Sequence, residues 1–137
     1  MIPKLIKVDR HNDSRGQLIP VELEEPAMRF YTSTNWMCGM VRAWHGHPKE
    51  WRVVRCIRGA AKICALDMSD MKTVHEFVLS SDKSEVLYIP KGFANGWKSL
   101  RFDAEMLYLS PTHYADRDDV RIDSDIRKDV WGQGKAY

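Results

Sequence analysis

The stretch that decides the fold reads Gly39-Met-Val-Arg-Ala-Trp-His45-Gly-His47-Pro-Lys-Glu-Trp-Arg52-Val-Val-Arg-Cys-Ile-Arg-Gly59. Residues 40–47 form an extended run in which two histidines stand two positions apart. A strand places side chains at that spacing on the same face of a sheet. Pro48 and Lys49 interrupt the run, and residues 51–57 resume it as a second β-rich segment. The stretch therefore predicts two strands that carry histidines and arginines on rigid elements, which suits a site.

Short β-rich segments recur on both sides of this stretch, and none shows ten residues of helical periodicity. Pro20 places one of them, residues 18–23, at a sheet edge. We expect residues 60–66 to pair with 53–57 as a hairpin across the turn signal Arg58-Gly59. Many short strands separated by Gly and Pro turns predict an all-β sandwich or barrel. The remaining strands are expected at 5–8, 29–34, 74–79, 86–89, 93–100 and 104–109, with a turn-rich loop at 11–16.

The length of 137 residues predicts a single domain, with a barrel over about residues 5–110 and a loop or short helical segment over 111–137. The charged residues 115–129 are expected outside the core, and residues 132–137 as a frayed end. A net charge of +2 argues against a dedicated nucleic-acid binder. No run approaches the ~20 apolar residues of a membrane span, and no apolar signal segment precedes the domain. The three cysteines lack metal or disulfide spacing, which indicates reduced thiols in a cytoplasmic protein.

Several short motifs follow one another along residues 13–126: Asp13-Ser-Arg15-Gly16, Arg42-Ala-Trp-His45, Tyr88-Ile-Pro-Lys-Gly-Phe-Ala-Asn95-Gly, Ala104-Glu-Met-Leu-Tyr108 with the later Tyr114, and Asp123-Ser-Asp125-Ile126. In this order they resemble the motifs of the dTDP-4-dehydrorhamnose 3,5-epimerases. Gly39-x5-His45-x-His47 followed by Pro90-x-Gly92 also resembles the paired motifs of cupins. The resemblance implies a cupin jelly-roll barrel.

The same resemblance implies epimerisation next to the ketone of a dTDP-linked 4-keto-6-deoxyhexose, in cell-surface polysaccharide synthesis, and we expect no metal or organic cofactor. We also expect a homodimer, because open sheet edges in so short a barrel are often covered by a partner. Such a reaction needs a base on one face of the sugar, an acid on the other, and positive charge where the enolate oxygen develops. The resemblance makes His45 the base, Asp123 the carboxylate that orients it, and Tyr108 the acid.

Further residues are expected to bind the substrate. Arg42 and Arg52 can hold enolate or diphosphate oxygens, because a planar guanidinium binds oxyanions well. By resemblance, Arg15 would reach the nucleotide across the dimer interface. His47, Asn95 and Tyr114 complete the expected pocket, and His47 is more typical of pocket lining than of a second proton-transfer role.

The chain also departs from the family pattern. Asn95 stands where the family has histidine, Arg52 where it has lysine, and Ile63 where it has aspartate. The dTDP-4-keto-6-deoxyhexose 3,4-ketoisomerases are an alternative, because they share the Asp-x-Arg-Gly start and carry His-Ala-His at the position of His45-Gly-His47.

Two further classes of protein remain possible from the sequence. A metal-binding cupin would use His45, His47, a nearby carboxylate and a histidine after Pro90-x-Gly92. That last position is Asn95, and an arginine at position 52 is electrostatically unfavourable for a divalent ion, so we expect no metal. A non-catalytic sugar-binding barrel is the third alternative.

Overall fold

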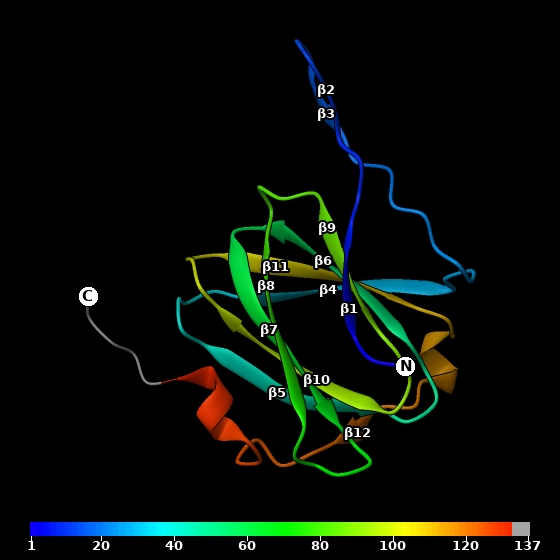
Figure 1. The fold of residues 1–137 in the computed structure, drawn as a ribbon, viewed down its shortest axis with the longest axis vertical. Coiled ribbons are helices and arrows are strands. Elements are labelled where there is room, and N and C mark those ends of the chain that lie inside the picture. The colour runs from blue at the N-terminus through cyan, green and yellow to red at the C-terminus, as the bar shows by residue number, and fades with distance from the viewer. Residues whose placement is uncertain (133–137) are drawn as a thin grey trace.

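The computed structural model describes residues 1–132, which form two five-stranded antiparallel sheets packed as a sandwich (Figure 1). The first sheet has the order β1 (Lys4–Lys7), β9 (Glu85–Ile89), β6 (Arg52–Arg58), β11 (Ala104–Ser110), β4 (Arg29–Asn35). The second has the order β12 (Val120–Arg121), β5 (Val41–His47), β10 (Phe93–Ser99), β7 (Ala60–Asp67), β8 (Val74–Ser80). The predicted all-β jelly-roll fold is confirmed. None of the described helices has the length or apolar character needed to cross a membrane.

The main core lies between the two sheets and follows the alternation of the strands. Along β11 every second residue is buried, so Ala104, Met106 and Tyr108 point into the sandwich. Their partners include Ile63 of β7 and Trp97 of β10 from the opposite sheet. Period-two patterning therefore gives each strand one inner face, which is the condition for a shared core.

The predicted hairpin across Arg58-Gly59 is wrong. β6 pairs with β9 and β11, whereas β7 pairs with β10 and β8 in the other sheet. The chain crosses between the sheets at Gly59, whose φ is +76°, and a Cβ there would lie 3.1 Å from the Ala104 Cα. The same turn signal serves a tight hairpin and a crossing between layers, so sequence could not separate the two.

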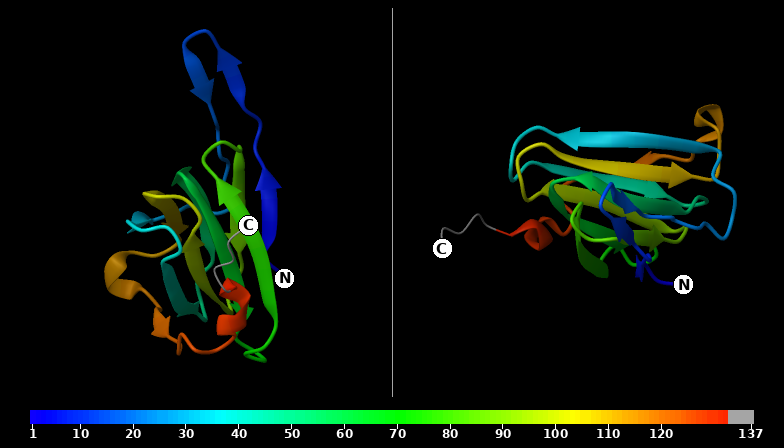
Figure 2. Two further views of the ribbon diagram at one scale, coloured as in Figure 1. Left: turned by 90° about the vertical axis from the view of Figure 1, so that its left-hand side faces the viewer. Right: turned by 90° about the horizontal axis from the view of Figure 1, so that it is seen from above.

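The N-terminal predictions also need correction. The expected loop at 11–16 contains a hairpin of β2 (His11–Asp13) and β3 (Gly16–Leu18), and residues 19–28 contain no strand, against the strand expected at 18–23. This hairpin, here called the arm, projects from the body of the sandwich (Figures 1 and 2), and every residue of β2 and β3 is exposed.

The C-terminal segment contains two short 3-10 helices, η1 (Tyr114–Asp116) and η2 (Lys128–Trp131), on either side of β12. Ile122 and Ile126 pack, partly buried, against the buried Trp44 and Trp131 on the outer face of the second sheet. The expectation that residues 115–129 lie outside the core is therefore wrong for these two isoleucines. Apart from Gly132, the predicted frayed end falls outside the described residues.

Candidate active site

A cavity of about 440 Å³ is lined by residues of both sheets. β4 and β11 supply one wall, and β5 and β10 supply the other. The segment that follows β11 supplies the rest of the lining. The lining residues are Arg29, Phe30, Tyr31, Thr32, Ser33, Arg42, His45, His47, Asn95, Trp97, Tyr108, Tyr114, Arg117 and Asp119.

His45 and Tyr108 line this cavity from different sheets, His45 from β5 and Tyr108 from β11. His45 is partly buried, and burial together with the nearby Arg121 lowers its pKa below 6.5. Tyr108 is buried, and burial raises its pKa well above 10. Near neutral pH the imidazole is thus free to accept a proton, while the phenol holds one to donate.

Tyr31 is a second phenol in the cavity, which the sequence analysis did not identify. Its ring stacks on that of Tyr108 with centroids 5.0 Å apart and planes 3° from parallel. The two residues are cross-strand partners between β4 and β11. Burial raises the pKa of Tyr31, although the Arg52 guanidinium opposes this effect.

Arg52, expected to hold substrate oxygens, is 1% exposed and is not among the lining residues. Each of its guanidinium nitrogens already has a protein partner. The bonds run from Nε to the Tyr31 hydroxyl (2.9 Å), from Nη1 to Glu50 Oε1 (3.2 Å) and the Trp51 carbonyl (3.0 Å), and from Nη2 to Asp119 Oδ1 (3.5 Å). The structure therefore places this cation inside the wall of the cavity.

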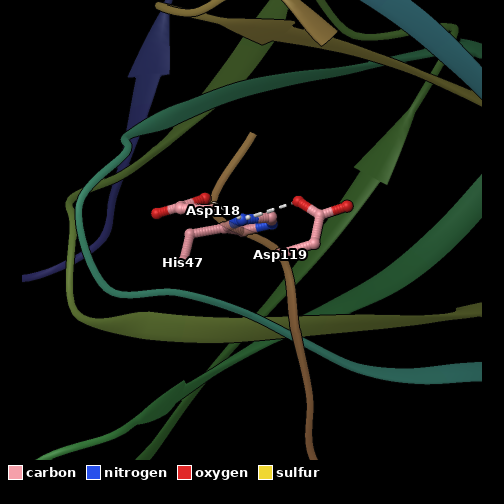
Figure 3. Close-up of side chains that lie close together, drawn as sticks. All are labelled: His47, Asp118 and Asp119. Atoms are coloured by element: carbon pink, nitrogen blue, oxygen red, sulfur yellow. Dashed lines mark hydrogen bonds and ion pairs between the residues drawn. The ribbon is translucent and has the colours of Figure 1, made fainter. Parts of the chain in front are cut away.

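His47 lies in the same wall, and its Nδ1 is 3.1 Å from Asp118 Oδ1 and 3.3 Å from Asp119 Oδ1 (Figure 3). Two carboxylates at this nitrogen favour the tautomer that carries the proton on Nδ1. Burial and the Arg52 guanidinium lower the pKa of His47 despite these carboxylates, so the ring is neutral near pH 7. The backbone N–H groups of Lys49 and Glu50 donate to Asp118 Oδ2 at 2.8 and 3.0 Å.

Glu50 joins Arg52 and Asp118 in one hydrogen-bond network. Its side chain is buried and accepts hydrogen bonds from Ser110 Oγ (3.0 Å), Thr112 Oγ1 (2.7 Å) and the Asp118 N–H (2.6 Å). Burial alone would raise its pKa, but these hydrogen bonds and Arg52 outweigh burial and lower the pKa to about 2. Glu50 is therefore ionised and pairs with Arg52 over the whole working pH range.

The donor atoms of His47, Asp118 and Asp119 lie within 4.8 Å of one another, a grouping that can hold a metal ion. However, Arg52 Nη2 is 3.2 Å from His47 Nδ1 and 3.5 Å from Asp119 Oδ1. A fixed guanidinium so close to the donor atoms repels a divalent cation. The cluster is thus better suited to hydrogen bonding than to metal coordination.

Two predicted site residues lie away from the cavity of their own chain. Asp123 is exposed, and its Oδ1 accepts the Asp125 N–H at 2.9 Å. Within residues 1–132 no hydrogen bond or ion pair joins it to His45. Arg15 sits near the tip of the arm, where its side chain is 88% exposed and pairs with Asp13. Neither residue lines the cavity.

The other predicted binding residues do line it. Arg42 donates from Nε to Asn35 Oδ1 at 2.7 Å and from Nη2 to the Thr34 carbonyl at 3.0 Å. Asn95 is 4% exposed and is the cross-strand partner of His45.

Tyr114, also predicted, is exposed and carries two arginines around its ring. The guanidinium carbons of Arg117 and Arg29 lie 3.9 and 5.8 Å from the ring centroid. With Arg42, these arginines give the lining of the cavity several cations.

Asp118, Asp119 and Glu50 were likewise not predicted as site residues from the sequence. Asp118 and Asp119 belong to a charged run that is typical of a solvated face, and Glu50 stands between the two expected strands. The available signal was the order of the charges: an acidic pair follows the aromatic and basic residues Tyr114 and Arg117 within a few positions.

Comparison with known proteins gives a consistent family. A family model described as dTDP-4-dehydrorhamnose 3,5-epimerase matches residues 4–128. The chain is 32% identical over 129 residues to "Probable low-salt glycan biosynthesis epimerase Agl13" of Haloferax volcanii, covering 82% of this chain and 81% of that protein.

Solved structures share the fold. The dTDP-4-dehydrorhamnose 3,5-epimerase of Bacillus anthracis, with TDP and PPi bound, superposes with a TM-score of 0.81 at 19% identity over 92% of this chain and 81% of that chain. The sugar 3,4-ketoisomerase QdtA of Thermoanaerobacterium thermosaccharolyticum, in complex with TDP, gives a TM-score of 0.75 at 26% identity over 88% of each chain.

Proposed function

Because the chain belongs to the dTDP-4-dehydrorhamnose 3,5-epimerase family, we propose that it epimerises carbon next to the ketone of a nucleotide-linked 4-keto-6-deoxyhexose. The family resemblance drawn from the motifs is thereby confirmed. The prediction that the protein is an enzyme of the sugar epimerase or isomerase class is confirmed with it. The observation that carries the specific reaction is that His45 and Tyr108 line one cavity from opposite sheets. A base and an acid on two sides of a bound sugar are what inversion at carbon requires.

In the proposed step, the neutral His45 removes the proton from the carbon next to the ketone. The electrons of the C–H bond form a carbon–carbon double bond, and the carbonyl electrons move to oxygen as an enolate. Tyr108 then donates its proton to the opposite face of the same carbon, and the carbonyl re-forms. The sugar loses one proton and gains another while the electron pair returns to carbon, so no redox cofactor takes part. The step leaves His45 protonated and Tyr108 as a phenolate, and exchange of one proton with solvent at each side chain restores both.

Cations at the cavity support a nucleotide-linked substrate. Arg42, Arg29 and Arg117 all line it, and guanidinium groups bind diphosphate oxygens well. Tyr114 and the exposed Phe30 offer ring faces on which a nucleobase can stack. These residues support a substrate of the dTDP-4-keto-6-deoxyhexose class. Arg52 is assigned a positioning role, since its nitrogens are all engaged within the wall.

A homodimer is part of the proposal, and the arm supports it. An isolated two-stranded hairpin is marginally stable in water, and Leu18 on the arm is 64% exposed. Arg15 does not reach its own cavity. We assign it to the cavity of a partner subunit. Mixing an Arg15→Ala chain with a His45→Asn chain would test this: hybrid dimers regain activity if Arg15 acts across the interface, and stay inactive if it acts within its own chain.

The place in the cell follows from the same proposal. The matched Haloferax protein is named for glycan biosynthesis, and we propose that this chain serves the assembly of a surface polysaccharide. Cys38, Cys56 and Cys64 are free thiols, which suits the reducing cytoplasm.

A 3,4-ketoisomerase is the second candidate, and a specific observation favours it. His47 is a second neutral imidazole in the cavity lining, and its Nδ1–H is held by Asp118 in the way that orients a general base. Ketoisomerisation begins with the same proton abstraction but returns the proton to the neighbouring carbon.

Incubation with dTDP-4-keto-6-deoxyglucose, followed by NMR of the product, separates the possibilities. A 4-keto sugar inverted beside the ketone supports epimerisation, whereas a 3-keto product supports ketoisomerisation. Unchanged substrate that nevertheless binds the protein would indicate the non-catalytic sugar-binding barrel.

A further inference from the structure

Two buried side-chain nitrogens lack a hydrogen-bond partner within the described residues: Asn95 Nδ2 and Trp131 Nε1. An unpaired buried donor costs stability and is rare in native proteins, so each asks for an explanation. The two differ in their surroundings. Trp131 packs with Ala43 and Trp44 in the cluster on the outer face of the second sheet, away from the cavity. Asn95 lines the cavity.

The position of Asn95 relates it directly to His45. The two residues are opposite each other in the β5–β10 pair, so their side chains share the inner face of the sheet with Cβ atoms about 5 Å apart. On its other side Asn95 faces Ala65 of β7, which offers no side-chain acceptor. The carboxamide is therefore held beside the imidazole with a donor that no group of residues 1–132 accepts.

The reaction needs a donor at this place. When His45 takes a proton, negative charge collects on the carbonyl oxygen, two bonds from the carbon that loses the proton. The group that stabilises this oxygen must thus be an immediate neighbour of the base. Arg52, the cation expected there, is turned into the wall and engaged by Tyr31 and Glu50. Arg42 lines the cavity but donates to Asn35 and Thr34.

We propose that Asn95 is a catalytic residue, whose Nδ2–H donates a hydrogen bond to the carbonyl oxygen of the sugar and strengthens as that oxygen becomes an enolate. The inference rests on the proposed function. It assigns charge stabilisation to a neutral amide, where the family pattern has a histidine and the nearby cation is engaged elsewhere. The unpaired donor of the free protein is then a preorganised group that gains its partner when the sugar binds.

The substitution Asn95→Leu tests this, because leucine has nearly the same shape and no donor. We expect deuterium exchange into dTDP-4-keto-6-deoxyglucose to fall about 10²-fold or more, as for loss of one oxyanion donor. The melting temperature should stay level or rise by a few degrees, roughly, because an unpaired buried amide has been removed. A merely structural asparagine would give a lower melting temperature instead.

Trp131→Phe is the matched control, since it removes the other unpaired donor. It should leave exchange unchanged. Exchange by the Asn95→Leu variant within about twofold of wild type would overturn the inference, because one oxyanion donor is worth far more than that.

Failure of the proposed function has a different signature. If wild type binds the keto sugar nucleotide but catalyses no exchange, binding affinities test the role of Asn95 instead. Asn95→Leu should then weaken binding of dTDP-4-keto-6-deoxyglucose about tenfold and leave binding of TDP alone unchanged. Equal weakening of both, or of neither, would overturn it. Absence of any binding by wild type would overturn both proposals.

Discussion

The site divides into two groups of side chains, here called the anchored end, around His47, and the reactive end, around His45, which lies two residues earlier on strand β5. At the anchored end, His47 belongs to a network with Glu50, Arg52 and Asp118 in which each side chain is hydrogen-bonded to another member. At the reactive end, the His45 side chain has no hydrogen-bond partner within residues 1–132, and the Asn95 Nδ2 donor beside it is unpaired. A fully satisfied polar network holds a wall in one conformation, whereas unsatisfied groups await a ligand. The contrast supports a structural role for the His47 network and a role in substrate binding for His45 and Asn95.

Of the substitutions at the anchored end, removal of Arg52 should cause the largest loss in the free energy of unfolding. Arg52→Met leaves Glu50 and Asp119 without their buried cation, which destabilises a protein by about 3–5 kcal/mol. Urea unfolding measures this loss. Arg58→Met on the same strand is the control, because the Arg58 side chain is 55% exposed and an ion pair of an exposed arginine, here with Glu105, is worth about 1 kcal/mol or less. Equal losses in the two variants would remove the distinction between a wall cation and a surface cation.

The stacked rings of Tyr31 and Tyr108 extend the comparison. The Tyr31 hydroxyl accepts a hydrogen bond from Arg52 of the anchored end, whereas the Tyr108 hydroxyl is the proposed acid of the reactive end. Tyr108→Phe removes an acid and should lower epimerisation about 10²-fold or more with little change in stability. Tyr31→Phe leaves Arg52 Nε without its acceptor and should instead destabilise the fold by about 1–3 kcal/mol. Steady-state kinetics and thermal unfolding of both variants check this. The account fails here if the Tyr31 variant loses the larger part of the activity.

Acid should unfold the protein through the anchored end. The folded-state pKa of Glu50, about 2, lies below its ordinary 4.5, so its stabilisation is complete above pH 4.5 and is lost as the pH falls from there to about 2. The difference corresponds to about 3 kcal/mol at most. The lowered pKa values of His45 and His47 act in the same direction below pH 6.5, because the unfolded chain binds those protons first. A pH series of unfolding free energies for wild type and Glu50→Gln measures the contribution of Glu50.

The smallest expected effect is that of metal ions. Since Arg52 lies against the donor atoms of His47 and Asp119, a chelator should leave activity and melting temperature unchanged, and added zinc should not raise the melting temperature. A zinc-dependent rise that disappears in His47→Asn would show that the cluster accepts a cation after all.

Much of the fold followed from period-two patterning, which predicted most strands of the sandwich to within one or two residues. Pairing was harder, because a glycine turn at position 59 serves both a hairpin and a crossing between sheets. The arm was missed because His11-Asn12-Asp13 carries none of the β-branched or aromatic residues typical of strands.

The site likewise contains residues that motifs predicted and residues whose role only the tertiary structure shows. His45, Tyr108, Arg42, His47, Asn95 and Tyr114 were predicted from motifs and line the cavity. Asp118 and Glu50 were missed because local charge patterns do not reveal which carboxylates a distant loop brings against a strand. Arg52 was predicted to face the substrate, since the sequence shows that an arginine is present but not that Tyr31 and Glu50 engage it.

The most direct test compares the two histidines in one assay. Deuterium incorporation into dTDP-4-keto-6-deoxyglucose in deuterated water is followed by NMR for wild type, His45→Asn and His47→Asn, with each variant shown to be folded. We expect exchange to be lost in His45→Asn, whereas His47→Asn should retain measurable exchange and show reduced stability. Loss of exchange in His47→Asn alone would contradict it and move the base to the end described here as anchored.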